Sequence, residues 1–158
     1  MLTLIDAGLL DAVTNEAAAS PRKRKNRNFH ERNDFPCHRL LNAIEPGSYV
    51  APHRHLAAHK DETMLLLRGT AGFISFTDSG QPVDVVLLGA ASSRFGVDIP
   101  HGTWHTIFAL ETGTIVFEAK AGPYLALAAA ERAPWAPVEG DAAAAAYLDS
   151  LVRLVVRA

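Results

Sequence analysis

The sequence has little cysteine, little net charge and no long apolar run. Its single cysteine, Cys37, cannot form an intrachain disulfide, so nothing requires an oxidising compartment. The formal net charge of −2 does not favour nucleic acid or an anionic membrane as the main partner. The longest apolar stretches, near Met64–Leu67 and Val152–Val156, are far too short to span a bilayer. We therefore expect a cytoplasmic protein that binds neither nucleic acid nor a membrane, with Cys37 as a buried structural thiol.

The N-terminal segment has the pattern of an amphipathic helix. Apolar residues recur at helical spacing from Asp6 to Ala19, and Ser20-Pro21 then ends the helix, because a residue before proline avoids the helical conformation. The segment lacks a basic leader and carries acids among its apolar residues, which favours a helix over a signal peptide. The basic run Arg22–Arg27 follows, and it suits either an anion-binding segment or a solvated connector.

Between residues 28 and 121 the pattern changes to short strands separated by turns that contain glycine or proline. The predicted strands are Asn28–Glu31, His38–Ile44, Tyr49–Arg54, Thr63–Arg68, Gly72–Thr77, Val83–Leu88, Arg94–Ile99, His105–Leu110 and Thr114–Lys120. Short strands at intervals of about 8–12 residues favour an all-β sandwich or barrel over alternating α/β units.

The C-terminal segment is predicted to return to helix. Gly122-Pro123 breaks the last strand, and Asp141 is a good N-cap for the alanine-rich stretch that follows. The apolar stripe of this helix, which runs from Tyr147 to Val155, should pack on the barrel or on a partner chain. We predict a single domain over residues 1–158, with a helix at about 6–19, a barrel at about 28–121 and a helix at about 141–157.

Four residues have the types and spacing of metal ligands. His53 and His55 are alternate residues of a predicted strand, so both side chains project from the same face and can bind one ion. Glu62 begins the next strand, and His105 begins a later one. Three imidazoles and one carboxylate suit iron(II), manganese, nickel, cobalt or zinc, and an octahedral ion would keep two positions for water or substrate. His59, in the loop before Glu62, is the alternative fourth ligand.

These residues resemble the two sequence motifs of the cupins. The first motif is usually written G-x5-H-x-H-x3,4-E-x6-G, and Gly47, His53, His55, Glu62 and Gly69 fit it, except that six residues separate His55 from Glu62. The second is G-x5-P-x-G-x2-H-x3-N. Its core positions are filled by Pro100, Gly102 and His105, whereas Arg94 and Ala109 replace the usual glycine and asparagine. The resemblance implies a fold dominated by β-structure, the double-stranded β-helix or jelly-roll barrel, with a helix at each end.

A narrower resemblance runs through nearly the whole chain. The segments Ser20–His30, Arg39–His55, Ile99–Thr106, Phe117–Tyr124 and Ala133–Asp141 are similar to those of the WbuC family of cupin-fold metalloproteins. The family name comes from genes in bacterial O-antigen clusters. The resemblance therefore implies a metalloprotein with a role in surface polysaccharide or nucleotide-sugar metabolism, but it implies no particular reaction.

Polar residues on neighbouring strands are candidates for contact with a substrate. We expect Asn28, His30, Arg39 and Asn42 to lie in the pocket beside the ion, with Arg39 able to bind a carboxylate or phosphate. Arg39 could instead pair with Glu118 as part of the fold. Glu118 and Lys120 share a strand face, where they suit either acid–base roles or a structural ion pair.

Three classes of function fit these features. The first is a metal-dependent isomerase, epimerase or lyase that acts on a small polar or sugar-derived molecule, in which the ion polarises a carbonyl or hydroxyl group. The second is an iron(II)-dependent dioxygenase, and the third is a module that binds a metabolite without turnover. The apolar C-terminal helix also offers a surface for a homodimer.

Overall fold

A computed structural model describes residues 2–157 of the chain, so the predicted domain of residues 1–158 extends one residue further at each end. Two helices flank eight strands, and 3-10 turns lie at Ala90–Ser92 and Ala129–Glu131. The elements are α1 (Ala7–Ala19), β1 (Arg24–Asn28), β2 (Cys37–Ile44), β3 (Glu62–Arg68), β4 (Ala71–Phe76), β5 (Pro82–Leu88), β6 (Gly96–Ile99), β7 (Trp104–Ala109), β8 (Thr114–Ala121) and α2 (Ala144–Arg157).

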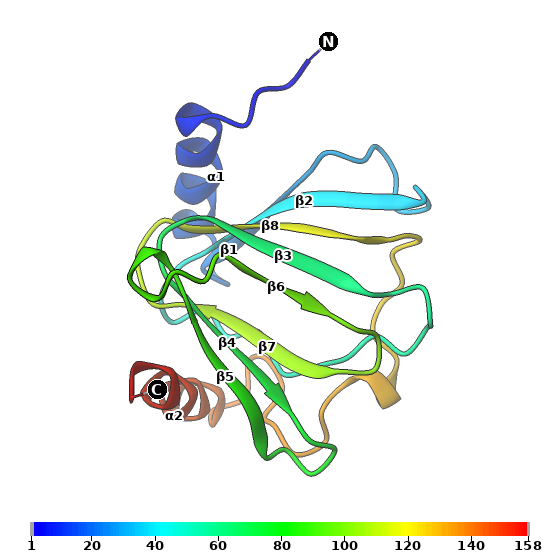
Figure 1. Cartoon of the computed structure of the whole chain (residues 1–158), viewed down its shortest axis with the longest axis vertical. Helices are drawn as coiled ribbons and strands as arrows, with labels where there is room; N and C mark the ends of the chain where they lie inside the picture. Colours follow the sequence, from blue (N-terminus) through cyan, green and yellow to red (C-terminus); the bar gives the residue numbers. More distant parts are fainter. Residues whose placement is uncertain (1, 158) are drawn as a thin grey trace.

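The strands form two antiparallel sheets that face each other (Figure 1). The larger has the order β1-β2-β8-β3-β6 and the smaller the order β5-β4-β7. Helix α1 covers one end of the larger sheet, and α2 lies against the smaller sheet on the side away from the larger one. This arrangement is the jelly roll of the cupin fold, as predicted.

Alternation along the strands distributes apolar side chains among three clusters. Met64, Phe73 and Val116 belong to the cluster between the two sheets. A second cluster packs α1 on the larger sheet, and a third packs α2 on the smaller one. Strands β4 and β7 are buried at every position because the other sheet covers one face and α2 covers the other. The apolar stripe of α2 therefore packs on the chain's own barrel, which was one of the two predicted alternatives.

Both helices begin near the predicted residues. The carboxylate of Asp6 accepts a hydrogen bond from the Leu9 amide and caps α1. The carboxylate of Asp141 accepts from the Ala143 amide, in the turn that leads into α2. Within the described residues, no helix is long and apolar enough to cross a membrane.

Three local predictions were wrong. The first strand begins at Arg24 rather than Asn28, because the second part of the basic run, from Arg24 to Arg27, pairs with β2. The segment predicted as the strand Tyr49–Arg54 makes only two isolated bridges, from His53 to His105 and to Arg132, so it is a loop. Cys37 is exposed rather than buried, because it begins β2 on the face opposite the barrel interior, beyond the reach of α1.

Candidate metal centre and adjoining cavity

Main-chain pairing brings three histidines together. The His53 amide donates to the His105 carbonyl at 3.0 Å, and the His105 amide donates back at 2.9 Å. The two rings consequently lie side by side with centroids 4.6 Å apart, and His55 lies 5.3 Å from His53. His105 is 1% exposed because its strand, β7, is covered on both faces. The H-x-H spacing and the later histidine therefore meet at one end of the sandwich.

Backbone carbonyls fix the orientation of two of these rings. Nδ1 of His53 lies 3.0 Å from the Ala51 carbonyl oxygen, and Nδ1 of His105 lies 2.9 Å from that of Thr103. A carbonyl only accepts, so Nδ1 must donate and Nε2 keeps its lone pair. Each histidine is thus oriented by the residue two positions before it, which is the tautomer and support that a metal-binding imidazole needs.

Glu62 joins the histidines from the first position of β3. Its Oε2 lies 3.3 Å from His105 Nε2 and 3.6 Å from His55 Nε2, while Oε1 accepts a hydrogen bond from Lys120 Nζ at 2.9 Å. The residue is 1% exposed. His59, the alternative ligand, is exposed in the preceding loop. The structure therefore places Glu62, and not His59, with the three histidines.

Three donor atoms of this cluster are buried without a hydrogen-bond partner among the described residues: His55 Nε2, Glu62 Oε2 and His105 Nε2. Buried polar atoms are rarely left without a partner, so their meeting at one point needs an explanation. Across residues 2–157 there is no set of three or more histidine, cysteine, aspartate or glutamate side chains already placed as metal ligands. The residue types fit a borderline divalent ion, but their side chains would have to close around it.

The protonation states of the cluster also suit a metal. Burial lowers the pKa of His53 to about 3, and burial likewise lowers the pKa of His55, so both imidazoles are neutral near pH 7. Burial alone would raise the pKa of Glu62, but the charge of Lys120, 2.9 Å from Oε1, holds it well below its usual range. Neutral histidines and an ionised carboxylate are the forms that coordinate metal ions.

Lys120 connects this cluster to a second buried carboxylate. Its Nζ lies 2.6 Å from Glu118 Oε1, so the two residues form an ion pair, which was one of the two predicted alternatives. The other carboxylate oxygen of Glu118 accepts a hydrogen bond from Asn42 Nδ2. Burial and the neighbouring charge of Glu62 raise the pKa of Glu118 to about 7.

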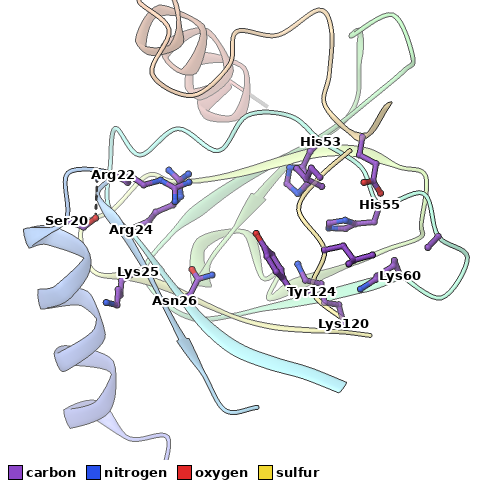
Figure 2. A pocket seen from close by; sticks show the side chains of 14 residues that line it. Ser20, Arg22, Arg24, Lys25, Asn26, His53, His55, Lys60, Lys120 and Tyr124 are labelled. Carbon is purple, nitrogen blue, oxygen red and sulfur yellow. Dashed lines mark hydrogen bonds between the residues drawn. The ribbon is translucent and has the colours of Figure 1, made fainter. Parts of the chain in front are cut away.

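A cavity of about 560 Å³ opens beside the histidines. His53 and His55 lie at one end of the view in Figure 2, with Lys60 and Lys120 next to His55. Residues of the basic run and of β1 lie at the other end. Its complete lining is Ser20, Arg22, Arg24, Lys25, Asn26, His53, His55, Ala57, Lys60, Lys120, Tyr124, Leu125, Leu127 and Glu131. The sequence did not show that the basic run Arg22–Arg27 forms part of a cavity wall, although the run was recognised as a possible anion-binding segment.

The predicted substrate-binding residues do not all reach a cavity. Asn28 and His30 line a separate cavity of about 290 Å³, which also borders Glu118 and Lys120. Asn42 contacts Glu118 and lines none of the cavities described.

Arg39 lies on the other face of β2. Its guanidinium donates to the Phe29 carbonyl at 3.4 Å and lies 5.7 Å from the centre of the Phe35 ring. Side chains alternate along a strand, so Arg39 points away from the interior that His38 and Leu40 face. It neither lines a cavity described here nor forms the predicted alternative pair with Glu118, which Lys120 and Asn42 contact instead.

The two-sheet jelly roll is the cupin fold, and the histidines and the glutamate gather at one end of it. The chain belongs to the family described as "Domain of unknown function (DUF6016)", which matches residues 5–88, just over half of its length. No curated protein matches the sequence.

Solved structures share the fold at low sequence identity. The conserved SPY1581 protein of unknown function from Streptococcus pyogenes is 12% identical, with 79% of this chain and 91% of that chain covered and a TM-score of 0.52. The protein TT1209 from Thermus thermophilus is 16% identical, with 76% and 97% covered and a TM-score of 0.52. A cupin superfamily protein from Desulfitobacterium hafniense is 12% identical, with 62% and 76% covered and a TM-score of 0.48. The first two structures, with TM-scores of 0.52, show a shared fold and not a shared activity.

Proposed function

We propose that this protein is a metal-binding cupin in which His53, His55, Glu62 and His105 hold one divalent transition metal. One observation carries the proposal: three buried donor atoms of these residues meet without any hydrogen-bond partner among the described residues. A bound cation would satisfy all three at once. The donor set suits iron, manganese, nickel, cobalt or zinc.

We further propose that the protein is an enzyme acting on a small polar molecule derived from a sugar. A bound ion would supply Lewis-acid chemistry that polarises a carbonyl or hydroxyl group, as in isomerases, epimerases and lyases. The chain's own residues orient the centre: Lys120 holds Oε1 of Glu62, so Oε2 faces the histidines. The cavity of about 560 Å³ is within the range of small-molecule sites.

The biological setting of the proposal comes from the resemblance to the WbuC family. The segments that carry it include the loop before His53 and the strand that contains Glu118 and Lys120. We accordingly propose a role in surface polysaccharide metabolism and a cytoplasmic location. A homodimer through the exposed apolar residues of α2, Leu154 and Val156, is also proposed.

Metal analysis of variants tests the centre. Protein purified without added metal should contain about one equivalent of a first-row ion. His105→Ala should lower metal affinity by more than the roughly 10- to 100-fold that changes in outer-shell partners cause. His59→Ala is the matched control, because it also removes an imidazole but from an exposed loop, and it should bind metal like the wild type. Equal metal affinity in the wild type and His105→Ala would overturn the assignment.

Activity assays separate the three classes of function. The proposed enzyme should convert at least one member of a panel of sugar phosphates, sugar acids and nucleotide sugars without consuming oxygen. Oxygen uptake by the iron-loaded protein with one of these compounds would instead show a dioxygenase. Recovery of a tightly bound compound unchanged, with no turnover across the panel, would show a metabolite-binding module.

A further inference from the structure

Positive side chains dominate the wall of the 560 Å³ cavity. Five of its lining residues are lysine or arginine and one, Glu131, is acidic. The sequence as a whole has 15 basic and 17 acidic residues, so this concentration is local. Figure 2 shows the basic groups in two places, with Arg22, Arg24 and Lys25 at one end and Lys60 and Lys120 beside His55. Lys25 and Lys120 pair with acidic side chains outside this lining, so the charge that favours an anionic ligand comes from Arg22, Arg24 and Lys60.

The arginines are held in place before any ligand binds. The Arg24 guanidinium donates to the Tyr49 carbonyl at 3.0 Å, to Ser48 Oγ at 3.3 Å and to Glu139 at 2.6 Å. Arg22 donates to both oxygens of Glu139 at 2.7 Å. One carboxylate therefore serves two guanidinium groups, which leaves one positive charge in excess. Arg22 Nη1 and Arg24 Nε make no hydrogen bond to the described residues and remain available as donors.

Lys60 adds a charge without an acidic partner. Its ammonium donates to the carbonyl oxygens of Ala121, at 2.8 Å, and Pro123. It forms no ion pair with a carboxylate in the described part of the chain, although it is half-buried. Carbonyl oxygens fix its position but do not neutralise it. Lys60 therefore adds to the positive potential of the cavity, which attracts an anionic ligand.

Tyr124 lies between the arginine end and the histidine end of the cavity in Figure 2. The residue borders both cavities described above and is 57% exposed. An exposed ring with a hydroxyl group offers both an apolar face and a hydrogen-bonding atom, which suits the mixed surface of a sugar.

We propose that the cavity binds a small phosphorylated sugar, with its phosphate at Arg22 and Arg24 and its hydroxyl groups toward His53 and His55. Guanidinium groups match the geometry of phosphate oxygens, and positions fixed in advance lower the cost of binding. A volume of about 560 Å³ accommodates a monosaccharide phosphate. This proposal rests on the proposed function, because it places the sugar end of the ligand beside the histidine cluster. It adds the chemical class of the substrate.

Calorimetric titration with glucose 6-phosphate, glucose and inorganic phosphate tests the proposal. The wild type should bind glucose 6-phosphate at least about 10-fold more tightly than glucose, and the affinity should fall as salt is added. Arg22→Gln should weaken binding of the sugar phosphate by at least about 5-fold, as expected for loss of a charge-assisted contact. Arg32→Gln is the matched control, because Arg32 pairs with Asp34 at the surface and lines none of these cavities. Its affinity should equal that of the wild type, and melting curves should show that every variant is folded.

The outcomes distinguish this inference from the proposed function. Equal binding of glucose and glucose 6-phosphate, or an equal loss in Arg22→Gln and Arg32→Gln, would overturn the phosphate site even if the protein binds a metal. If binding depends on the phosphate and on Arg22 and persists after treatment with a chelator, the phosphate site is supported. If the protein also binds no metal, the metal centre is overturned while the phosphate site stands. Binding of glucuronate as tight as that of glucose 6-phosphate would replace the phosphorylated sugar with a sugar acid.

Discussion

Replacing Lys120 with methionine tests how two neighbouring carboxylates remain buried. Lys120 Nζ lies 2.9 Å from Glu62 Oε1 and 2.6 Å from Glu118 Oε1, and the glutamate side chains are 2% and 6% exposed. Methionine keeps most of the apolar stem but removes the charge. Removing one partner of a buried ion pair costs about 3–5 kcal/mol, because the remaining charge is uncompensated. Since Lys120 is itself 19% exposed, we expect a loss of about 3 kcal/mol in the free energy of unfolding.

Urea unfolding at pH 7 in the presence of a chelator measures this loss. The chelator matters because a bound cation would itself compensate Glu62. Lys25→Met is the matched control: Lys25 pairs with Glu16 at 3.1 Å, but both side chains are at least half exposed, so about 0–1 kcal/mol is expected. In the Lys120→Met background, Glu118→Gln should recover about 1 kcal/mol by relieving repulsion between carboxylates. A loss in Lys120→Met no larger than in Lys25→Met would refute this account of the buried carboxylates.

Three further predictions concern stability. Hydrogen bonds and charge from Arg22 and Arg24 hold the pKa of Glu139 at about 2, below the ordinary 4.5, so these ion pairs stabilise the fold above pH 4.5 and their contribution disappears as the pH falls toward 2. Urea unfolding should therefore show that Glu139→Gln lowers the free energy of unfolding by about 1 kcal/mol at pH 7 and not at pH 2. The value at pH 7 is small because the Glu139 side chain is 37% exposed and solvent screens its charge. Gly69 and Gly102 both have φ near +80°, but a Cβ at Gly69 would overlap Thr114 whereas one at Gly102 meets nothing within 4 Å. Melting curves should show a larger loss for Gly69→Ala, by about 1–3 kcal/mol, and equal losses would contradict this steric overlap. Leu148 lies on the buried side of α2, so Leu148→Ala should lower the free energy of unfolding in urea by about 2–5 kcal/mol. Leu154→Ala, on the exposed side, should lower it far less. Similar values for the two variants would argue against this packing of α2.

The cluster of candidate ligands was predictable because its residues have a recognisable spacing in the sequence. The strand predicted around His53 and His55 is a loop, but their motif spacing still identified them, and the distance from Glu62 to Gly69 matches one strand and its turn. Sequence spacing also favoured Glu62 over His59, and the structure shows the physical reason: the loop carries His59 into solvent, while the pairing of β3 with β8 places Glu62 opposite Lys120.

The wall of the cavity was not predictable in the same way. Successive side chains of β2 point to opposite faces of the sheet, so the face that Arg39 occupies depends on which set of alternate residues packs against α1. The sequence alone does not show which set that is. The basic run looked like either a connector or an anion site, because no local signal shows that it pairs with β2. The partner of Arg22 and Arg24 is Glu139, more than a hundred residues away, and only the folded chain brings it near.

The distances along the chain that separate these partners have a kinetic consequence. His53 meets His105, Glu62 meets Lys120, and Arg22 meets Glu139, so each contact closes a long loop. Long loops are slow to close, and the cavity should be completed after the sheets have largely formed. A ligand that recognises the completed cavity has nothing to bind in the earlier states. It should therefore slow unfolding while leaving the rate of folding almost unchanged.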